Sequence, residues 1–262
     1  MGLLSRLGIG AATVEPALHA PRVVAGDTAP VRVTVRGGSS GQHADELTVR
    51  LVTEATTGGG GTELVTVAET VLATDLRVDP ETEREFAGAL DVPVWAPITG
   101  VGAEGGTEVV LAATLAMDWS REPTGRTGVQ VDPAPRLDRA LAALAALGIQ
   151  VERARPVISS VGGSEAPTAP DDPPVVQQFD CHPHAGPYVG RISDLTVVAV
   201  PEPGALVLHL DTDVATETAY GTTDAYECFT TVEVTDESVP TLRRQFERAL
   251  GTGTTSDPSP GV

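Results

Sequence analysis

The sequence contains no lysine, and aromatic residues make up only 3% of its 262 residues. Its 36 acidic residues outnumber the 17 basic ones, all of them arginine, and the formal net charge is -19. This balance argues against a nucleic-acid partner, because neutralising phosphates requires a basic patch. It argues equally against binding to an anionic membrane surface. A basic protein remains a suitable partner, and the core must consist mainly of valine, leucine and alanine.

Cysteine and long apolar runs are also scarce. The two cysteines, Cys181 and Cys228, do not make a secreted disulfide framework, although a single bridge between them stays open. No apolar run approaches the roughly 20 residues of a membrane span. The N-terminal sequence MGLLSRLGIGAATVE has no signal-peptide core. We therefore expect a cytoplasmic protein without membrane insertion.

Residues 1–131 are predicted to form an antiparallel β-sandwich. Val31, Val33 and Val35 alternate with polar residues, which is the period of a strand with one buried face. About seven such segments are joined by short turns rich in glycine, proline and aspartate, as in a sandwich or barrel. The run Val109–Met117 is apolar throughout and is predicted to be buried on both faces. Residues 58–61, four glycines, lack the following Lys-Ser/Thr of a phosphate loop and are predicted to be a hairpin tip.

The clearest helix of the sequence is predicted over residues 132–148, at the junction between two domains. Asp132 suits the N-cap, Pro133 the first helical position and Gly148 the left-handed end. Its apolar stripe contains four leucines at helical spacing. We expect three of them to be buried, namely Leu137, Leu141 and Leu144.

The remaining chain is predicted to hold a linker, a second β domain and a C-terminal helix. Residues 149–174 are assigned to the linker or long loop, because they include a stretch rich in serine, glycine, proline and aspartate. Strand patterns resume in residues 175–235. Ser238 resembles the N-cap and Gly251 the stop of a helix within residues 236–251. Residues 252–262 lack apolar side chains to bury and are predicted to be disordered.

The strongest candidate for chemistry is the cluster Cys181-His182-Pro183-His184. A structural zinc site needs four ligands, usually from two knuckles, and here Cys228 and His209 would have to complete it through tertiary folding. A nucleophilic pair of Cys181 or Cys228 with a histidine has no local sequence signature. The competing interpretation of the cluster is a polar strand end, because Pro183 suits the edge or end of a strand.

Several motifs follow one another in a defined order: Gly8–Glu15 followed by Ala25–Gly38 and Gln42, then Leu115–Ser120, Val129–Ile149 and, more faintly, Val175–Pro183. Their order and spacing resemble those of the sporulation-control proteins of the SpoOM family. The resemblance implies an arrestin-like fold of two tandem β-sandwiches. It also implies a regulatory, non-enzymatic role, and it carries over no catalytic residue.

We therefore predict a mainly β protein of two tandem antiparallel β-sandwich domains, with one helix near their junction and one at the C-terminus. Its predicted function is that of a regulator or scaffold that binds protein partners, without a cofactor; self-association stays open. Two alternatives are a metal-binding module or metal-dependent enzyme centred on Cys181, His182 and His184, and a small-ligand-binding sandwich. Because Trp and Tyr are scarce, a carbohydrate that stacks on aromatic rings is a less suitable ligand for such a sandwich.

Overall fold

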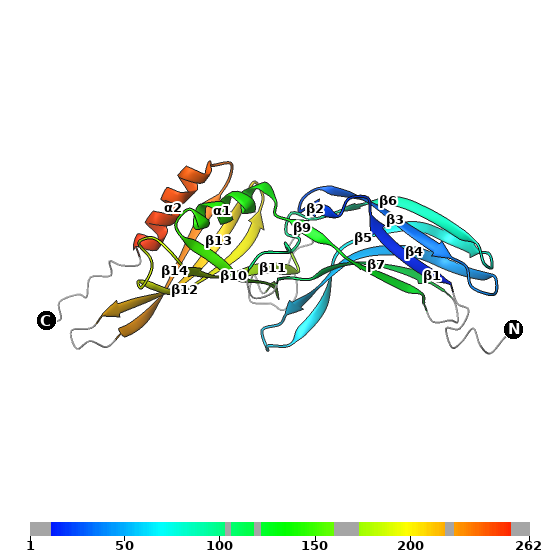
Figure 1. The fold of residues 1–262 in the computed structure, drawn as a ribbon, viewed down its shortest axis with the longest axis horizontal. Helices are drawn as coiled ribbons and strands as arrows, with labels where there is room; N and C mark the ends of the chain where they lie inside the picture. Colours follow the sequence, from blue (N-terminus) through cyan, green and yellow to red (C-terminus); the bar gives the residue numbers. More distant parts are fainter. Residues whose placement is uncertain (1–11, 103–105, 118–121, 160–172, 218–222, 253–262) are drawn as a thin grey trace. The chain divides into compact units, whose positions relative to one another are not determined.

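The computed structural model describes residues 12–102, 106–117, 122–159, 173–217 and 223–252. The chain forms two compact units, Met1–Thr99 with Glu108–Asp132, and Gly100–Thr107 with Pro133–Val262. Both are built mainly from β-strands (Figure 1). The elements in chain order are β1 (Thr13–Leu18), β2 (Arg22–Val24), β3 (Thr28–Arg36), β4 (Gln42–Thr56), β5 (Thr62–Val78), β6 (Glu83–Asp91), β7 (Val109–Ala116), β8 (Thr124–Gly128), β9 (Gln130–Asp132), α1 (Pro135–Ala145), β10 (Ile149–Ile158), β11 (Val175–Pro183), β12 (Ile192–Glu202), β13 (Ala205–Glu217), β14 (Thr223–Val234) and α2 (Val239–Thr252).

The first unit contains two antiparallel sheets that face each other. One has the order β1-β3-β6, and in the other β4 lies between β5 and β7, with β8 beside β7. The sheets meet where β1 contacts β7 and β8 and where β5 contacts β6. A short parallel pair, β2 with β9, completes the unit. This arrangement is the β-sandwich expected for the N-terminal half.

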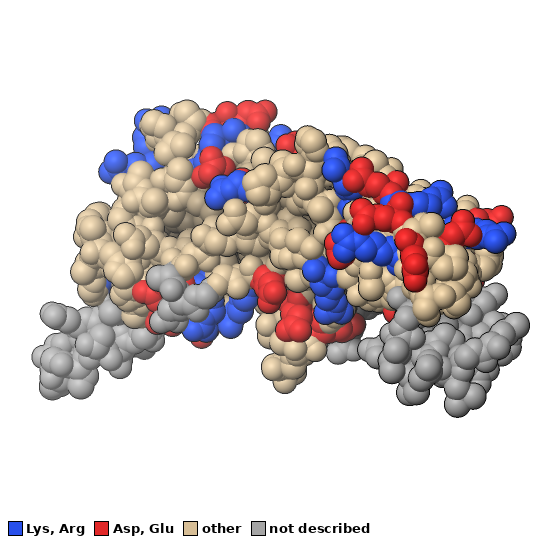
Figure 2. Space-filling model, turned by 45° about the vertical axis from the view of Figure 1, so that its right-hand side comes forward, with Lys and Arg blue, Asp and Glu red and all other residues tan. Residues whose placement is uncertain are grey.

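Alternating valines and leucines form the core of this unit. Val31, Val33 and Val35 of β3 are all buried, as the period of two predicts. β7 was expected to be buried on both faces, but only every second residue is buried and those between are half-buried. On the outside, Arg36 forms ion pairs with Glu15 of β1 and Glu83 of β6. Figure 2 shows arginines and carboxylates interleaved over this surface.

The second unit contains five antiparallel strands, β10 to β14, each beside the next in chain order. Two helices contact each other and the sheet, α1 through β10 and β13 and α2 through β14 (Figure 1). Phe179 of β11 and Phe246 of α2 are both fully buried. The mainly β fold with a helix before this sheet and one at the C-terminus is thus confirmed, and the layer that covers the sheet in this unit consists of the two helices.

The first helix is shorter than predicted and has a different start. α1 begins at Pro135, its N-cap residue is Ala134, and no side chain caps it. Asp132 instead belongs to β9, where its carboxylate lies 3.2 Å from the guanidinium of Arg22. The prediction of an Asp132 cap was wrong because strand pairing with β2 takes that residue before the helix begins. Gly148 does adopt the predicted left-handed conformation, with φ of 79°.

The buried face of α1 also differs from the predicted leucine stripe. Leu144 is buried, together with Ala140 and Ala143, whereas Leu137 and Leu141 are only half-buried. Small alanine side chains therefore form most of the buried face of α1, and Leu137 and Leu141 lie at its margin. The C-terminal helix follows the prediction more closely, because α2 begins directly after Ser238, although it includes the predicted stop Gly251 and ends at Thr252.

The predicted linker over residues 149–174 was wrong in its first part. Ile149–Ile158 form strand β10, which is paired with β11 along its whole length. An irregularity between Val151 and Arg153 breaks the alternation of buried and exposed positions, and Pro156 further disguises the strand. Residues 160–172 of the predicted linker and residues 253–262 of the predicted tail lie outside the described residues. Within the described ranges, no helix is long and apolar enough to span a membrane.

Replacing buried Leu144 by alanine should destabilise the second unit more than the same change at Leu141. Leu144→Ala empties a fully enclosed site and should lower the free energy of unfolding by about 2–4 kcal/mol. Leu141→Ala removes a half-buried side chain and should cost about 1 kcal/mol or less. Urea denaturation followed by circular dichroism measures both. Equal losses for the two variants would contradict the buried face assigned to α1.

Candidate functional site

The cysteine and the histidines of the predicted metal cluster lie on different sides of β11. Cys181 is buried in the helix-covered face of the sheet, and its Sγ lies 3.7 Å from the carbonyl oxygen of Phe179. His182 is the next residue along the strand and therefore points to the opposite face. The His182 and His184 rings lie edge to face with centroids 5.6 Å apart, and His184 Nε2 is 3.3 Å from Glu152 Oε1. Among the described residues, no three His, Cys, Asp or Glu side chains are grouped to hold a metal ion.

Neither cysteine has the surroundings of a nucleophile. Burial raises the pKa of Cys181 to about 12, with smaller contributions from Asp180 and Glu152. Its thiol is therefore protonated at neutral pH and is a weak ligand and nucleophile. Cys228 lies on the same face of the sheet, but two strands separate it from Cys181, and both thiols are free. The single disulfide left open by the sequence does not form.

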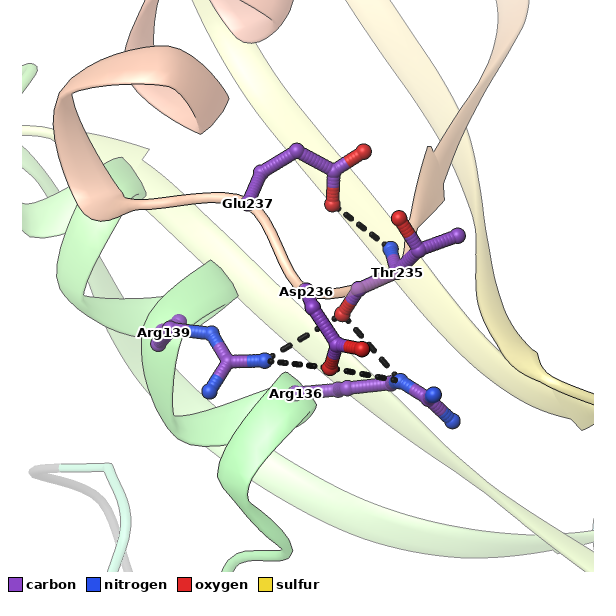
Figure 3. A network of polar contacts seen from close by, with 5 residues as sticks. All are labelled: Arg136, Arg139, Thr235, Asp236 and Glu237. Carbon is purple, nitrogen blue, oxygen red and sulfur yellow. Dashed lines mark hydrogen bonds and ion pairs between the residues drawn. The ribbon is translucent and has the colours of Figure 1, made fainter.

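A polar cluster joins α1 to the turn between β14 and α2 (Figure 3). Arg136 Nε and Arg139 Nη2 donate to the carbonyl oxygen of Thr235 at 3.1 and 3.2 Å, and Arg139 Nη2 also lies 3.5 Å from Asp236 Oδ1. The amide of Thr235 donates to Glu237 Oε2 at 2.7 Å. Hydrogen bonds from the backbone amides of Glu237 and Thr235 lower the pKa of the Glu237 carboxyl. These contacts hold the helix against the sheet, which is a structural role.

The face of the second sheet that points away from α1 and α2 is the strongest candidate for binding. Strand pairing aligns Thr196 of β12, Asp211 of β13 and Phe229 of β14 in one row. The adjacent row consists of Val198, His209 and Thr231. Side chains of both rows line a hollow of about 690 Å³. The hollow thus has a mixed apolar and polar lining on a regular sheet.

Phe229 is the most exposed large apolar side chain among the described residues, at 70%. The chain has only four phenylalanines, and two of them, Phe179 and Phe246, are fully buried in the same unit. The ring of Phe86, in the first unit, lies 5.0 Å from the guanidinium carbon of Arg84. Phe229 alone among the four is left on an open surface, where a partner could cover it.

Phe229 was not identified as a candidate from the sequence. The alternation of buried and exposed residues along β14 would have placed it on the exposed face. Val232 and Val234 are buried on the helix-covered face, whereas Glu227 and Glu233 are exposed. Phe229 shares the odd parity of the two glutamates and must therefore lie on the exposed face. The predicted metal residues, by contrast, are not brought together with this hollow; only His209, named as a fourth ligand, lines it.

The fold and this surface define a mainly β protein of two tandem units with a candidate binding face on the second. A family model described as "SpoOM protein" matches residues 1–216. The chain therefore belongs to the SpoOM family, the sporulation-control family that its motifs resemble. No curated protein sequence matches the chain.

Among solved structures, the chain is similar to the Spo0M sporulation control protein of Bacillus subtilis. The two share 20% sequence identity with a TM-score of 0.75, over 93% of this chain and 99% of that protein. This likeness supports the fold. A second match, a DUF4466 family protein from Parabacteroides merdae, has 10% identity and a TM-score of 0.29 over 87% of this chain and 100% of that one, which is too low to support an argument.

The two thiols should differ sharply in reactivity. In native protein at pH 8, we expect a thiol reagent to label half-buried Cys228 and to spare Cys181 until the protein unfolds. Cys228→Ser should therefore abolish native labelling. Rapid labelling of Cys181 in the native state would contradict its burial.

The stability of the folded state should also depend on pH. Because folding raises the pKa of Cys181 from 9.0 to about 12, the free energy of unfolding should fall as the pH rises from about 9 towards 12.

Proposed function

We propose that the protein is a non-enzymatic regulator that acts by binding a protein partner through the exposed face of the second sheet. The observation that carries this proposal is Phe229, which is 70% exposed and lines a hollow of about 690 Å³. An aromatic ring on an open, regular surface is typical of an interface anchor, because its burial gives large contact area at low entropic cost. Membership of the SpoOM family supports a regulatory role in sporulation control.

The two alternative functions receive less support from the described residues. A metal centre would require Cys181 and the neighbouring histidines to converge, but they lie on opposite faces of β11. A carbohydrate site would require stacking aromatics, and no Trp or Tyr lines the hollow around Phe229. A partner that offers both apolar and basic side chains suits the hollow better, because Asp211 lies in the same row as Phe229.

Replacing Phe229 should abolish partner binding without affecting the fold. We expect Phe229→Ser to reduce recovery of the specific partner by more than about tenfold in cross-linked co-purification from the native organism. Each recovered protein is then purified and its direct binding to the full chain measured. The melting temperature should change by no more than about 2 °C, since an exposed side chain contributes little to stability.

The matched control is Leu64→Ser, because Leu64 is a 54% exposed apolar side chain on β5 of the first unit. Its partner recovery should equal that of the wild type. The proposal is wrong if Phe229→Ser retains every partner that the wild type recovers, or if the two serine variants lose partners equally.

A further inference from the structure

We propose that the partner segment is an extended basic chain that adds to the second sheet as a further strand beside β14. The inference rests on the proposed function and specifies its mode of binding and the chemistry of the partner. Three independent features of β14 support it: its position at the end of the sheet, the hollows on its two sides, and a row of carboxylates that ends on it with Asp213 and Glu227 unpaired.

β14 is the terminal strand of the sheet, and among the described elements it is paired with β13 alone. The pairing runs without a register shift from Leu206↔Val234 to Glu217↔Thr223. Protein edges are usually protected against pairing by charged side chains, by proline or by bulges. β14 contains no proline and has no bulge against β13, and its charged residues are all acidic, which opposes an acidic segment but not a basic one. Its free edge therefore meets the geometric requirement for strand addition.

Hollows lie on both sides of this edge, and they meet at Thr230 and Thr231. The first is the hollow that contains Phe229. The second, of about 380 Å³, lies between β14 and α2 and is bordered by Gln245 and Arg248. Successive side chains of a strand point to opposite faces of its sheet. A chain added beside Thr230 and Thr231 would therefore place alternate side chains in the two hollows, an apolar one next to Phe229 and a polar one next to α2.

A row of three carboxylates ends on β14 and defines the charge of the partner. Strand pairing places Asp194 of β12 opposite Asp213 of β13, and Asp213 opposite Glu227 of β14. Like charges directly opposite each other destabilise a sheet. Within the described part of the chain, neither Asp213 nor Glu227 forms an ion pair, whereas Asp194 lines a hollow together with Arg153 and Arg155. An arginine or lysine of an added strand would lie beside Glu227 and relieve this repulsion.

A second copy of the chain is a poorer occupant of the same edge. Its β14 would bring Glu227 and Glu233 and no basic side chain, so Asp213 and Glu227 would remain unpaired. Each copy also has a formal net charge of -19, which opposes association through an acidic surface. A basic segment of another protein fits the edge, the hollows and the charge together.

The test uses the full chain and a capped nine-residue peptide that alternates threonine with valine or leucine and carries two arginines. Its counterpart has glutamates in place of the arginines. We expect the basic peptide to bind by calorimetry and to slow hydrogen exchange of backbone amides within residues 227–234, and the acidic peptide to do neither. Two further peptides are N-methylated at alternate residues. One set of methyl groups faces β14 and should weaken binding at least about tenfold, and the other set should not.

Charge recognition is tested with a double variant, Asp213→Asn with Glu227→Gln. It should weaken binding of the basic peptide about fivefold, and the loss should shrink at high salt because exposed ion pairs are screened. The matched control is Asp45→Asn with Glu63→Gln, which removes two exposed carboxylates of the first unit and should leave the affinity unchanged.

The outcomes separate this inference from the proposed function. Equal binding of both N-methylated peptides, or no binding of any peptide while partner capture still depends on Phe229, would overturn strand addition and leave the proposed function standing. Loss of dependence on Phe229 in partner capture would overturn the proposed function itself. A dimer in sedimentation that Phe229→Ser dissociates would assign the edge to a second copy and refute the basic partner.

Discussion

The structure of the second unit depends on one constraint: a sheet has two faces, and the chain provides helices to cover only one of them. α1 and α2 bury the side of β10–β14 that contains Phe179, Leu195 and Leu208. The other side combines acidic residues, arginine, threonine and histidine with several valines, among them Val198 and Val207. Among the described residues of this face, Phe229 is the large apolar side chain that is left exposed. A large aromatic ring exposed on a face that no described helix covers points to a function rather than to folding, and it therefore outweighs the scattered exposed aliphatic side chains elsewhere.

Alternation of apolar and polar residues was enough to predict most of the strands, since valine at every second position has one consistent explanation. Prediction failed where that period was interrupted. β10 was missed because an irregularity after Val151 shifts the alternation and Pro156 lies inside the strand. The start of α1 was misplaced because Asp132 and Pro133 have the chemistry of a helix cap, while a tertiary contact, the pairing of β9 with β2, uses Asp132 as a strand residue. Local propensity cannot detect such competition.

The candidate site was less predictable than the fold, for a different reason. A conspicuous cluster such as Cys181-His182-Pro183-His184 attracts attention because its residue types are chemically versatile, yet adjacent residues of a strand point to opposite faces. Conversely, Phe229 lies in a strand of ordinary composition. Its orientation follows from the alternation it shares with Glu227 and Glu233, which lie on the same face of the strand. Its significance depends on the fact that α1 and α2 cover the other face. The order of the strands and the placement of the helices are properties of the whole unit.

The strong acidity of the chain indicates a binding surface only where its unpaired carboxylates lie together. With 36 acidic residues and 17 arginines, the carboxylates outnumber their possible basic partners about two to one. In the first unit, arginines lie across strands from glutamates, as Arg36 does with Glu15 and Glu83. Each such exposed pair contributes at most about 1 kcal/mol. In the second unit, Asp213 of β13 and Glu227 of β14 lie opposite each other, and neither forms an ion pair among the described residues. Retaining repulsion beside an exposed phenylalanine and an unprotected edge strand is understandable if a basic partner relieves it.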